Sequence, residues 1–306
     1  MNKLIITGIL ALFFVTGSLF AAEQPEAGPW KVEFSTGLGI TQANYSDNWT
    51  GGEAGSINWV AFFNGMAKRQ LSRSWHWQND LKLAFGQQHT QNKDTKDWTS
   101  PEKSEDKVRY DGILKWTKGW FVDPYAALTV ESQFYDGTGL KDRYLNPLVL
   151  TETAGIARKL IDVENVRVVT TRLGAGFRQH INTYDAAVYA ADSSVSFVEE
   201  TETITDGGLE WVTDVLLGSA ESKYSFNSKL TLFQALMNSK SDELNDDWKE
   251  VDVNWDNIFR VKVSSIINVG LTWQLLYDKE IDDGGRLKQT LSLGLAYSFA
   301  NFEKEE

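Results

Sequence analysis

The residues of this 306-residue chain that are best suited to chemistry are three histidines and a set of carboxylates. His76, His89 and His180 could each serve as a general base that activates a serine for attack on a lipid ester. None of them has a His-x-Ser spacing, and His76 lies between Trp75 and Trp77. We therefore prefer histidines that line a lumen or meet solvent, and keep a membrane-embedded lipid hydrolase as the alternative.

The carboxylates recur at alternate positions in one segment, where Glu250, Asp252 and Asp256 share a face with Asn254. Alternate residues of an extended strand lie about 7 Å apart, so a calcium site would need further oxygen ligands from neighbouring strands. We predict no metal site, no cofactor and no catalytic residue. Inward-facing acids and bases should instead pair, because buried charges must be compensated. The candidate lumen-lining and selectivity residues are Asp80, Lys82, Arg109, Asp111, Lys115, Arg172, Glu250, Asp252, Asp256, Arg260 and Lys262.

These candidates belong to segments in which large apolar and small or polar residues alternate. The last segment is the clearest: from Leu291 to Phe299 every second residue is large and apolar. A period of two places the two sets on opposite faces of a β-strand. About twelve such segments follow one another, near residues 30–42, 56–68, 75–87, 108–116, 121–135, 148–159, 166–179, 207–218, 224–237, 250–263, 267–277 and 287–299.

The connections between the segments alternate between short turns and long loops, which include a polar loop over residues 88–106 and acidic loops near residues 180–206 and 238–247. An even number of strands with short turns on one rim and long loops on the other is typical of a transmembrane antiparallel up-and-down β-barrel. The sequence therefore predicts an all-β barrel of about 12 strands, with both chain ends on the periplasmic side. A secreted soluble β-barrel binding protein is the alternative, but its strands would be shorter.

The N-terminus has the form of a secretory signal. Lys3 precedes an apolar run from Leu4 to Phe20, and Ala21 and Ala22 offer small residues for cleavage. We predict a signal peptide over residues 1–22, a short periplasmic segment over 23–29, the barrel over 30–299 and an acidic periplasmic tail over 300–306. Export and a barrel together predict the bacterial outer membrane.

The composition limits the partners and the chemistry. The formal net charge is −12, which disfavours nucleic-acid binding, and the absence of cysteine excludes disulfides and thiol chemistry. The chain is rich in aromatic residues, with 12 Trp, 10 Tyr and 16 Phe, as barrels with interfacial aromatic girdles are. The expected partners are outer-membrane lipid, lipopolysaccharide, the barrel assembly machinery and small polar solutes.

Two motifs resemble those of known outer-membrane proteins. Ser292 to Phe299 resembles the C-terminal assembly signal of such barrels, with Gly294, Tyr297 and Phe299 at the characteristic positions and the chain continuing to Glu306. The stretch Asn48-Trp49-Thr50-Gly51-Gly52-Glu53 resembles a motif of an uncharacterised outer-membrane family of Bacteroidota-type bacteria.

The family resemblance implies a location and a fold, but it supplies no catalytic residues. The loop-motif candidates are Asn48, Trp49, Gly51, Gly52 and Glu53, either as a tight turn or as a contact for lipopolysaccharide or a partner. The function expected from all these observations is a non-enzymatic channel or a structural or interaction barrel.

Overall fold

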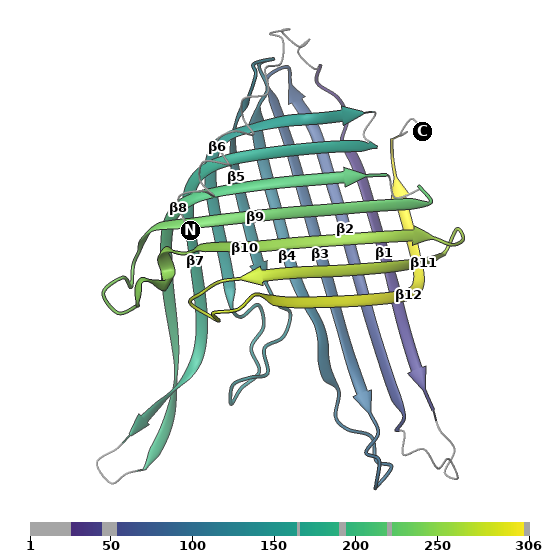
Figure 1. Cartoon of the computed structure of the whole chain (residues 1–306), viewed down its shortest axis with the longest axis vertical. Helices are drawn as coiled ribbons and strands as arrows, with labels where there is room; N and C mark the ends of the chain where they lie inside the picture. Colours follow the sequence, from purple (N-terminus) through teal and green to yellow (C-terminus); the bar gives the residue numbers. More distant parts are fainter. Residues whose placement is uncertain (1–25, 45–53, 164–165, 190–193, 219–221, 303–306) are drawn as a thin grey trace.

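The chain forms a closed barrel of twelve antiparallel strands in a computed structural model that describes residues 26–44, 54–163, 166–189, 194–218 and 222–302. Each strand pairs with its neighbours in the sequence, and β1 pairs with β12 to close the barrel (Figure 1). The predicted all-β, twelve-stranded antiparallel barrel is confirmed. Among the described residues no helix is long and apolar enough to cross a membrane. The strands are β1 (Lys31–Ala43), β2 (Ser56–Ser72), β3 (Trp75–Thr90), β4 (Glu102–Trp116), β5 (Asp123–Ser132), β6 (Leu148–Val163), β7 (Arg167–Tyr189), β8 (Val195–Leu217), β9 (Tyr224–Asn238), β10 (Val251–Lys262), β11 (Ile267–Tyr277) and β12 (Arg286–Ala300).

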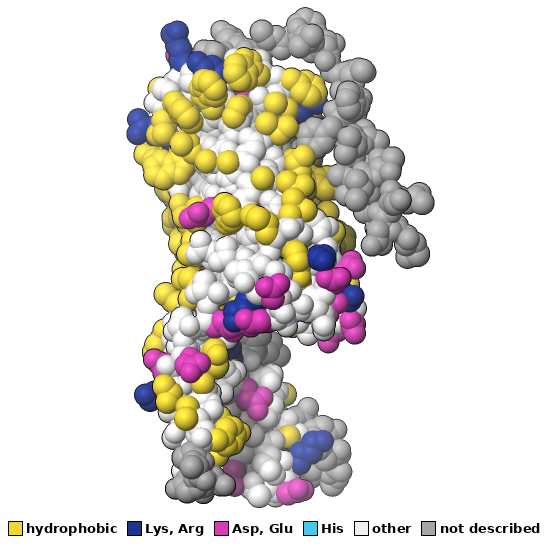
Figure 2. Space-filling view, turned by 90° about the vertical axis from the view of Figure 1, so that its left-hand side faces the viewer, with side chains coloured by type: hydrophobic (Ala, Val, Ile, Leu, Met, Phe, Trp, Pro, Cys, Tyr) yellow, Lys and Arg dark blue, Asp and Glu magenta, His cyan; other side chains and the backbone are white. Residues whose placement is uncertain are grey.

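The alternation of side chains places the apolar face outside. On β12, Leu291 and Leu293 are 72% and 63% exposed, whereas the intervening side of the strand carries serine, glycine and the buried Ala296. Figure 2 shows apolar side chains over the upper part of one face and acidic side chains gathered lower on it. A soluble barrel would bury its apolar face, so this arrangement is that of a barrel surrounded by lipid.

Aromatic residues gather at the rim with the short turns. Trp75 stacks on Trp116 with ring centroids 6.2 Å apart, Trp116 contacts Trp120 at 5.4 Å, and Trp30 contacts Trp77 at 5.6 Å. Tryptophan is amphipathic and prefers the level of the lipid head groups. The cluster therefore fits one interfacial girdle of the barrel.

The longest departure from the predicted elements is a hairpin that projects beyond the barrel at the lower left of Figure 1. Strands β7 and β8 stay paired from Arg167 and Leu217 to Tyr189 and Val195, so the predicted acidic loop over residues 180–206 is wrong. Threonine and valine alternate with acids there, and their β-branched side chains favour strands. The predicted loop over 88–106 is also shorter, because β3 ends at Thr90 and β4 begins at Glu102.

Strand β12 exchanges one partner for another along its length. It pairs with β11 from Arg286 to Leu295, and with β1 only from Gly294 to Ala300. Strand β1 continues beside β2 as far as Ala43, but its pairing with β12 ends at Gly39. The seam between β1 and β12 is therefore closed toward the short turns, and its two strands separate toward the long loops (Figure 1).

Candidate functional site

The inner wall of the barrel carries a buried charge cluster on β4 and β5. Arg109 donates from Nε to Asp111 at 2.8 Å and from a terminal nitrogen to Glu131 at 2.6 Å. Thr129 donates its hydroxyl to Asp111 at 2.9 Å. Arg109 and Asp111 are only 3% and 6% exposed, so each depends on the other for compensation of its charge.

Three ion pairs of 3.0 Å or less join β4 to walls of the barrel that are not its neighbours. Lys107 on β4 lies 3.0 Å from both carboxylate oxygens of Asp256 on β10. Lys229 on β9 lies 3.0 Å from Asp111 on β4, and Lys288 on β12 lies 2.7 Å from Glu105 on β4. The strand neighbours of β4 are β3 and β5, so each of these pairs crosses the lumen. We call the three pairs Lys107–Asp256, Lys229–Asp111 and Lys288–Glu105 the cross-lumen layer.

Further groups fill the lumen on either side of this layer. Toward the short turns Ile113, Tyr125 and Ala157 form a buried apolar cluster. Arg172 lies 3.6 Å from Glu210 on the neighbouring strand β8. Both the apolar cluster and this ion pair narrow the lumen at that end.

Toward the long loops, Arg178 binds two carboxylates, Asp252 at 2.6 Å and Asp206 at 3.0 Å. Its guanidinium group also lies 4.3 Å from the ring centroid of Phe233, and Asn238 donates to Asp206 at 2.7 Å. Charges on this side are therefore matched too, and because β7 and β10 are not neighbours the Arg178–Asp252 pair also spans the lumen.

The structure brings together most of the residues singled out in the sequence. Arg109, Asp111, Arg172, Asp252 and Asp256 all lie in the ion pairs of the lumen. Asp80 accepts a hydrogen bond from Gln78 at 2.8 Å, Lys115 lies opposite Tyr125, and Lys262 is the last residue of β10. Whether these residues control selectivity stays a prediction.

One placement is wrong. Glu250 does not share the inner face of β10, because it caps a short 3-10 helix, Asp246–Lys249, and donates its backbone N–H to Asp247. The strand begins one residue later, at Val251. The loop-motif residues 48–53 and the proposed signal peptide lie outside the described residues.

The sequence interpretation missed Glu105, Lys107 and Lys288, which are half of the cross-lumen layer. The first two were assigned to the edge of a polar loop. A period of two was present, however, because Glu105, Lys107, Arg109 and Asp111 alternate along β4. An uninterrupted run of alternating charge is the signal that would have located this wall of the lumen.

The described part of the chain offers no catalytic dyad to the hydrolase alternative. His76 contacts Gln70 at 3.2 Å, and no hydrogen bond joins any described histidine to a serine. Within the described ranges no group of three or more His, Asp or Glu side chains is arranged to hold a metal ion.

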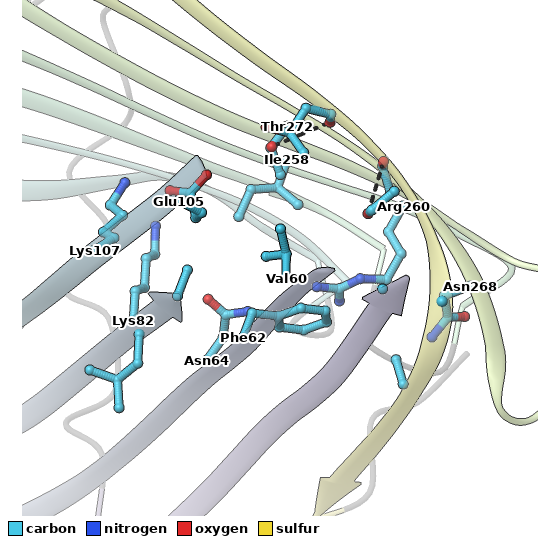
Figure 3. Close-up of a pocket in the computed structure, with 18 of the residues that line it drawn as sticks. Val60, Phe62, Asn64, Lys82, Glu105, Lys107, Ile258, Arg260, Asn268 and Thr272 are labelled. Atoms are coloured by element: carbon cyan, nitrogen blue, oxygen red, sulfur yellow. Dashed lines mark hydrogen bonds between the residues drawn. The ribbon is translucent and has the colours of Figure 1, made fainter. Parts of the chain in front are cut away.

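A cavity lies beside the cross-lumen layer, between the β1–β4 wall and the β10–β12 wall. We call it the seam cavity, and it has a volume of about 160 Å³. In Figure 3, Lys82 and Lys107 reach into it from one side and Arg260 from the other, with Val60 and Phe62 between Lys82 and Arg260. Its wall also includes Leu38 and Gly39 of β1, and Ser292, Gly294 and Leu295 of β12.

The fold and the lumen define a transmembrane β-barrel with a charged interior. Residues 40–137 match a family described as "Protein of unknown function (DUF3078)", which confirms the expected similarity to an uncharacterised family. No curated protein matches the chain. The matched range includes the loop-motif residues.

Among solved structures, the chain is similar to outer-membrane barrels. An outer membrane channel from Pseudomonas putida F1 has 13% identity and a TM-score of 0.37, over 94% of this chain and 99% of that one. The beta domain of the Bordetella autotransporter BrkA has 12% identity and a TM-score of 0.33, over 90% and 100% of the chains. The translocator domain of the autotransporter NalP from Neisseria meningitidis has 10% identity and a TM-score of 0.32, over 98% and 95%. At these values no function is transferred from them.

Proposed function

We propose that this protein is a non-enzymatic outer-membrane barrel that passes small polar solutes and is held closed at rest by the cross-lumen layer. The observation that carries the proposal is the Lys107–Asp256 pair, which joins opposite walls by two 3.0 Å contacts. A lumen lined by charged side chains suits polar solutes, and rings of such side chains set the selectivity of pores. Export through a cleaved signal peptide, insertion by the barrel assembly machinery and contact with lipopolysaccharide belong to the same proposal.

Among the residues that the structure describes, the closure is made by side chains and not by a folded plug, so a modest change can open it. Lys107 and Asp256 keep 26% and 11% of their side-chain surface exposed, so water already reaches the pair. Neutralising both members removes the attraction between the walls without leaving an uncompensated charge, which would otherwise destabilise the barrel. The double variant Lys107→Gln/Asp256→Asn is therefore the informative one.

The test is single-channel recording of the refolded protein in a planar bilayer. The wild type should show low or rare conductance, and Lys107→Gln/Asp256→Asn should conduct more often and with larger steps. The matched control is Asp246→Asn/Lys249→Gln, which neutralises an ion pair of 2.6 Å in an outer loop. Equal conductance of the wild type, the double variant and the control would overturn the proposed passage of solutes through the lumen.

A further inference from the structure

The open part of the β1–β12 seam leaves backbone groups without strand partners at the wall of the barrel. Register pairing between the strands ends at Gly39 and Gly294, although β1 extends to Ala43 and β12 starts at Arg286. Over Arg286–Leu293, β12 pairs with β11 alone among the described strands. Unpaired backbone is tolerated at membrane depth only where it is buried in protein or lines a water-filled cavity. The seam cavity lies at this place, since Gly39, Ser292 and Gly294 belong to its wall.

The cavity has an excess of positive charge. Four basic side chains (Lys82, Lys107, Arg260 and Lys288) and two acidic ones (Glu105 and Asp256) line it, which leaves two positive charges in excess. Both acids are already engaged in the cross-lumen layer, Asp256 by Lys107 and Glu105 by Lys288.

The two remaining cations, Lys82 and Arg260, face the cavity outside ion-pair distance of the described carboxylates. Neither Lys82 nor Arg260 lies within 4.0 Å of a carboxylate in the described part of the chain, and the charges of Asp256 on Lys82 and of Glu33 on Arg260 act from further away. Arg260 lies with its guanidinium carbon 6.0 Å from the ring centroid of Phe62, and Phe62 is itself seated over Gly37. Because a buried cation calls for a counter-charge, these side chains indicate an anionic group in the cavity.

Besides polar residues such as Asn64, Asn268 and Thr272, the cavity wall has apolar side chains that lead outward. Val60, Phe62 and Ile258 line the interior (Figure 3), and Leu38 and Leu295 belong to the wall at the seam. Outside the seam, Ile40, Leu291 and Leu293 are exposed to the surroundings of the barrel. An apolar route therefore runs from the cavity between β1 and β12 to the lipid-facing surface.

We propose that the seam cavity binds an anionic amphiphile. Its acidic head group is held by Lys82 and Arg260, and its acyl chain leaves between Ile40–Ala43 of β1 and Thr290–Leu293 of β12. The cavity volume of about 160 Å³ corresponds to about ten water-sized spheres at about 15 Å³ each, enough for a head group and the first part of a chain. Binding at this site does not require solute passage through the lumen, although the cavity shares Glu105, Lys107, Asp256 and Lys288 with the cross-lumen layer.

The first test is binding of 11-(dansylamino)undecanoic acid to the refolded full chain in uncharged detergent, followed by the rise in dansyl fluorescence. Lys82→Met and Arg260→Met should each weaken binding by about tenfold, since each removes one charged contact to the head group. The methyl ester of the probe should bind much more weakly than the acid. Lys159→Met, at the exposed end of β6, is the matched control and should bind as the wild type does. Equal binding of acid and ester, or wild-type binding by both cavity variants, would overturn the proposal.

The second test closes the seam with a pair of introduced cysteines. The chain has no cysteine of its own, so only the introduced pair can be cross-linked. Continued register would place Thr41 opposite Ser292, so a disulfide or a short bis-maleimide link in Thr41→Cys/Ser292→Cys holds the open part shut. Probe binding should fall by about tenfold and return when the disulfide is reduced. Ser35→Cys/Ser298→Cys is the control, because these residues are already paired in the closed part. Binding that survives the lock unchanged would contradict the route through the seam, whether or not the cavity variants fold.

Competition identifies the source of the head group. Dodecanoate and dilauroyl-phosphatidylglycerol are offered separately against the bound probe, with dilauroyl-phosphatidylcholine as the zwitterionic reference. Displacement by dodecanoate alone assigns a free fatty acid, and displacement by the phosphatidylglycerol assigns an acidic phospholipid. Displacement by neither, or equal displacement by all three, would refute recognition of an anionic head group.

Discussion

Replacing Arg109 with leucine tests whether the charge cluster of the lumen holds the barrel together. The side chain is 4% exposed and contacts both Asp111 and Glu131, so Arg109→Leu removes a partner from two carboxylates at once. Removing one member of a buried ion pair costs about 3–5 kcal/mol. The lower end applies here, because Asp111 keeps Lys229 at 3.0 Å and Glu131 is 34% exposed.

The assay is equilibrium urea unfolding in phospholipid vesicles, followed by the fluorescence of the 12 tryptophans. We expect Arg109→Leu to lower the free energy of unfolding by about 3 kcal/mol. Lys249→Met, which breaks an exposed pair in a loop, should change it by less than about 1 kcal/mol. Adding Lys229→Met to Arg109→Leu should cost more than the two single changes together, because Asp111 then loses both cations. A loss below about 1 kcal/mol for Arg109→Leu would refute the reasoning.

Three further predictions concern the seam, an outer loop and the hairpin. Gly294→Ala should lower the free energy of unfolding by about 1–3 kcal/mol, because a Cβ there would lie 2.5 Å from the Leu38 carbonyl oxygen. Gly28→Ala is the control, because a Cβ at that position meets nothing within 4 Å. Equal urea midpoints for the two variants would contradict this prediction. Burial, reinforced by Asp206 and Asp278, raises the pKa of Glu280 to about 7. Ionising Glu280 therefore destabilises the folded state, by an amount that is absent below the pKa of the unfolded state and grows as the pH rises toward 7. Glu280→Gln should thus raise the urea midpoint at pH 8 and leave it unchanged at pH 4. The same shift at both pH values would exclude this cause. Arg143 binds Asp185 at 2.6 Å at the base of the β7–β8 hairpin. Arg143→Ala should therefore speed proteolysis of that hairpin relative to the control Lys141→Ala. Equal rates of proteolysis would show that this contact does not stabilise the hairpin.

The sequence was sufficient for the barrel because lipid imposes a simple rule on it. Every strand must alternate, and the bounds of β11, Ile267–Tyr277, coincide with the predicted segment. The outer part of the β7–β8 hairpin was not predicted from the sequence, because a strand beyond the membrane does not need an apolar face. Its acidic residues therefore resemble those of a loop. Only its alternating threonines, such as Thr183 and Thr201, whose hydroxyls lie 2.9 Å apart, kept the strand pattern.

The pairing of charges could be predicted only in part. Sequence shows that Asp256 and Lys107 face inward if their strands alternate, but not that β4 stands opposite β10 across the lumen. That relation depends on the stagger of all twelve strands around the barrel, which no local pattern records. For the same reason, the seam cavity and the change of partner along β12 could not be found before the register was known.

The short seam has a consequence for the order in which the chain becomes a barrel. Its two strands join residues as distant as Phe34 and Phe299, whereas every other strand pair is a local hairpin. Closing such a loop costs about 4 kcal/mol more in chain entropy than closing a turn of a few residues. After β12, the Asn301 side chain accepts a hydrogen bond from the N–H of Val32 at 2.8 Å and donates one to the carbonyl of Trp30 at 3.0 Å. These two hydrogen bonds hold the end of β12 to the start of β1. Closure thus comes last, and it is secured by a residue that directly follows β12.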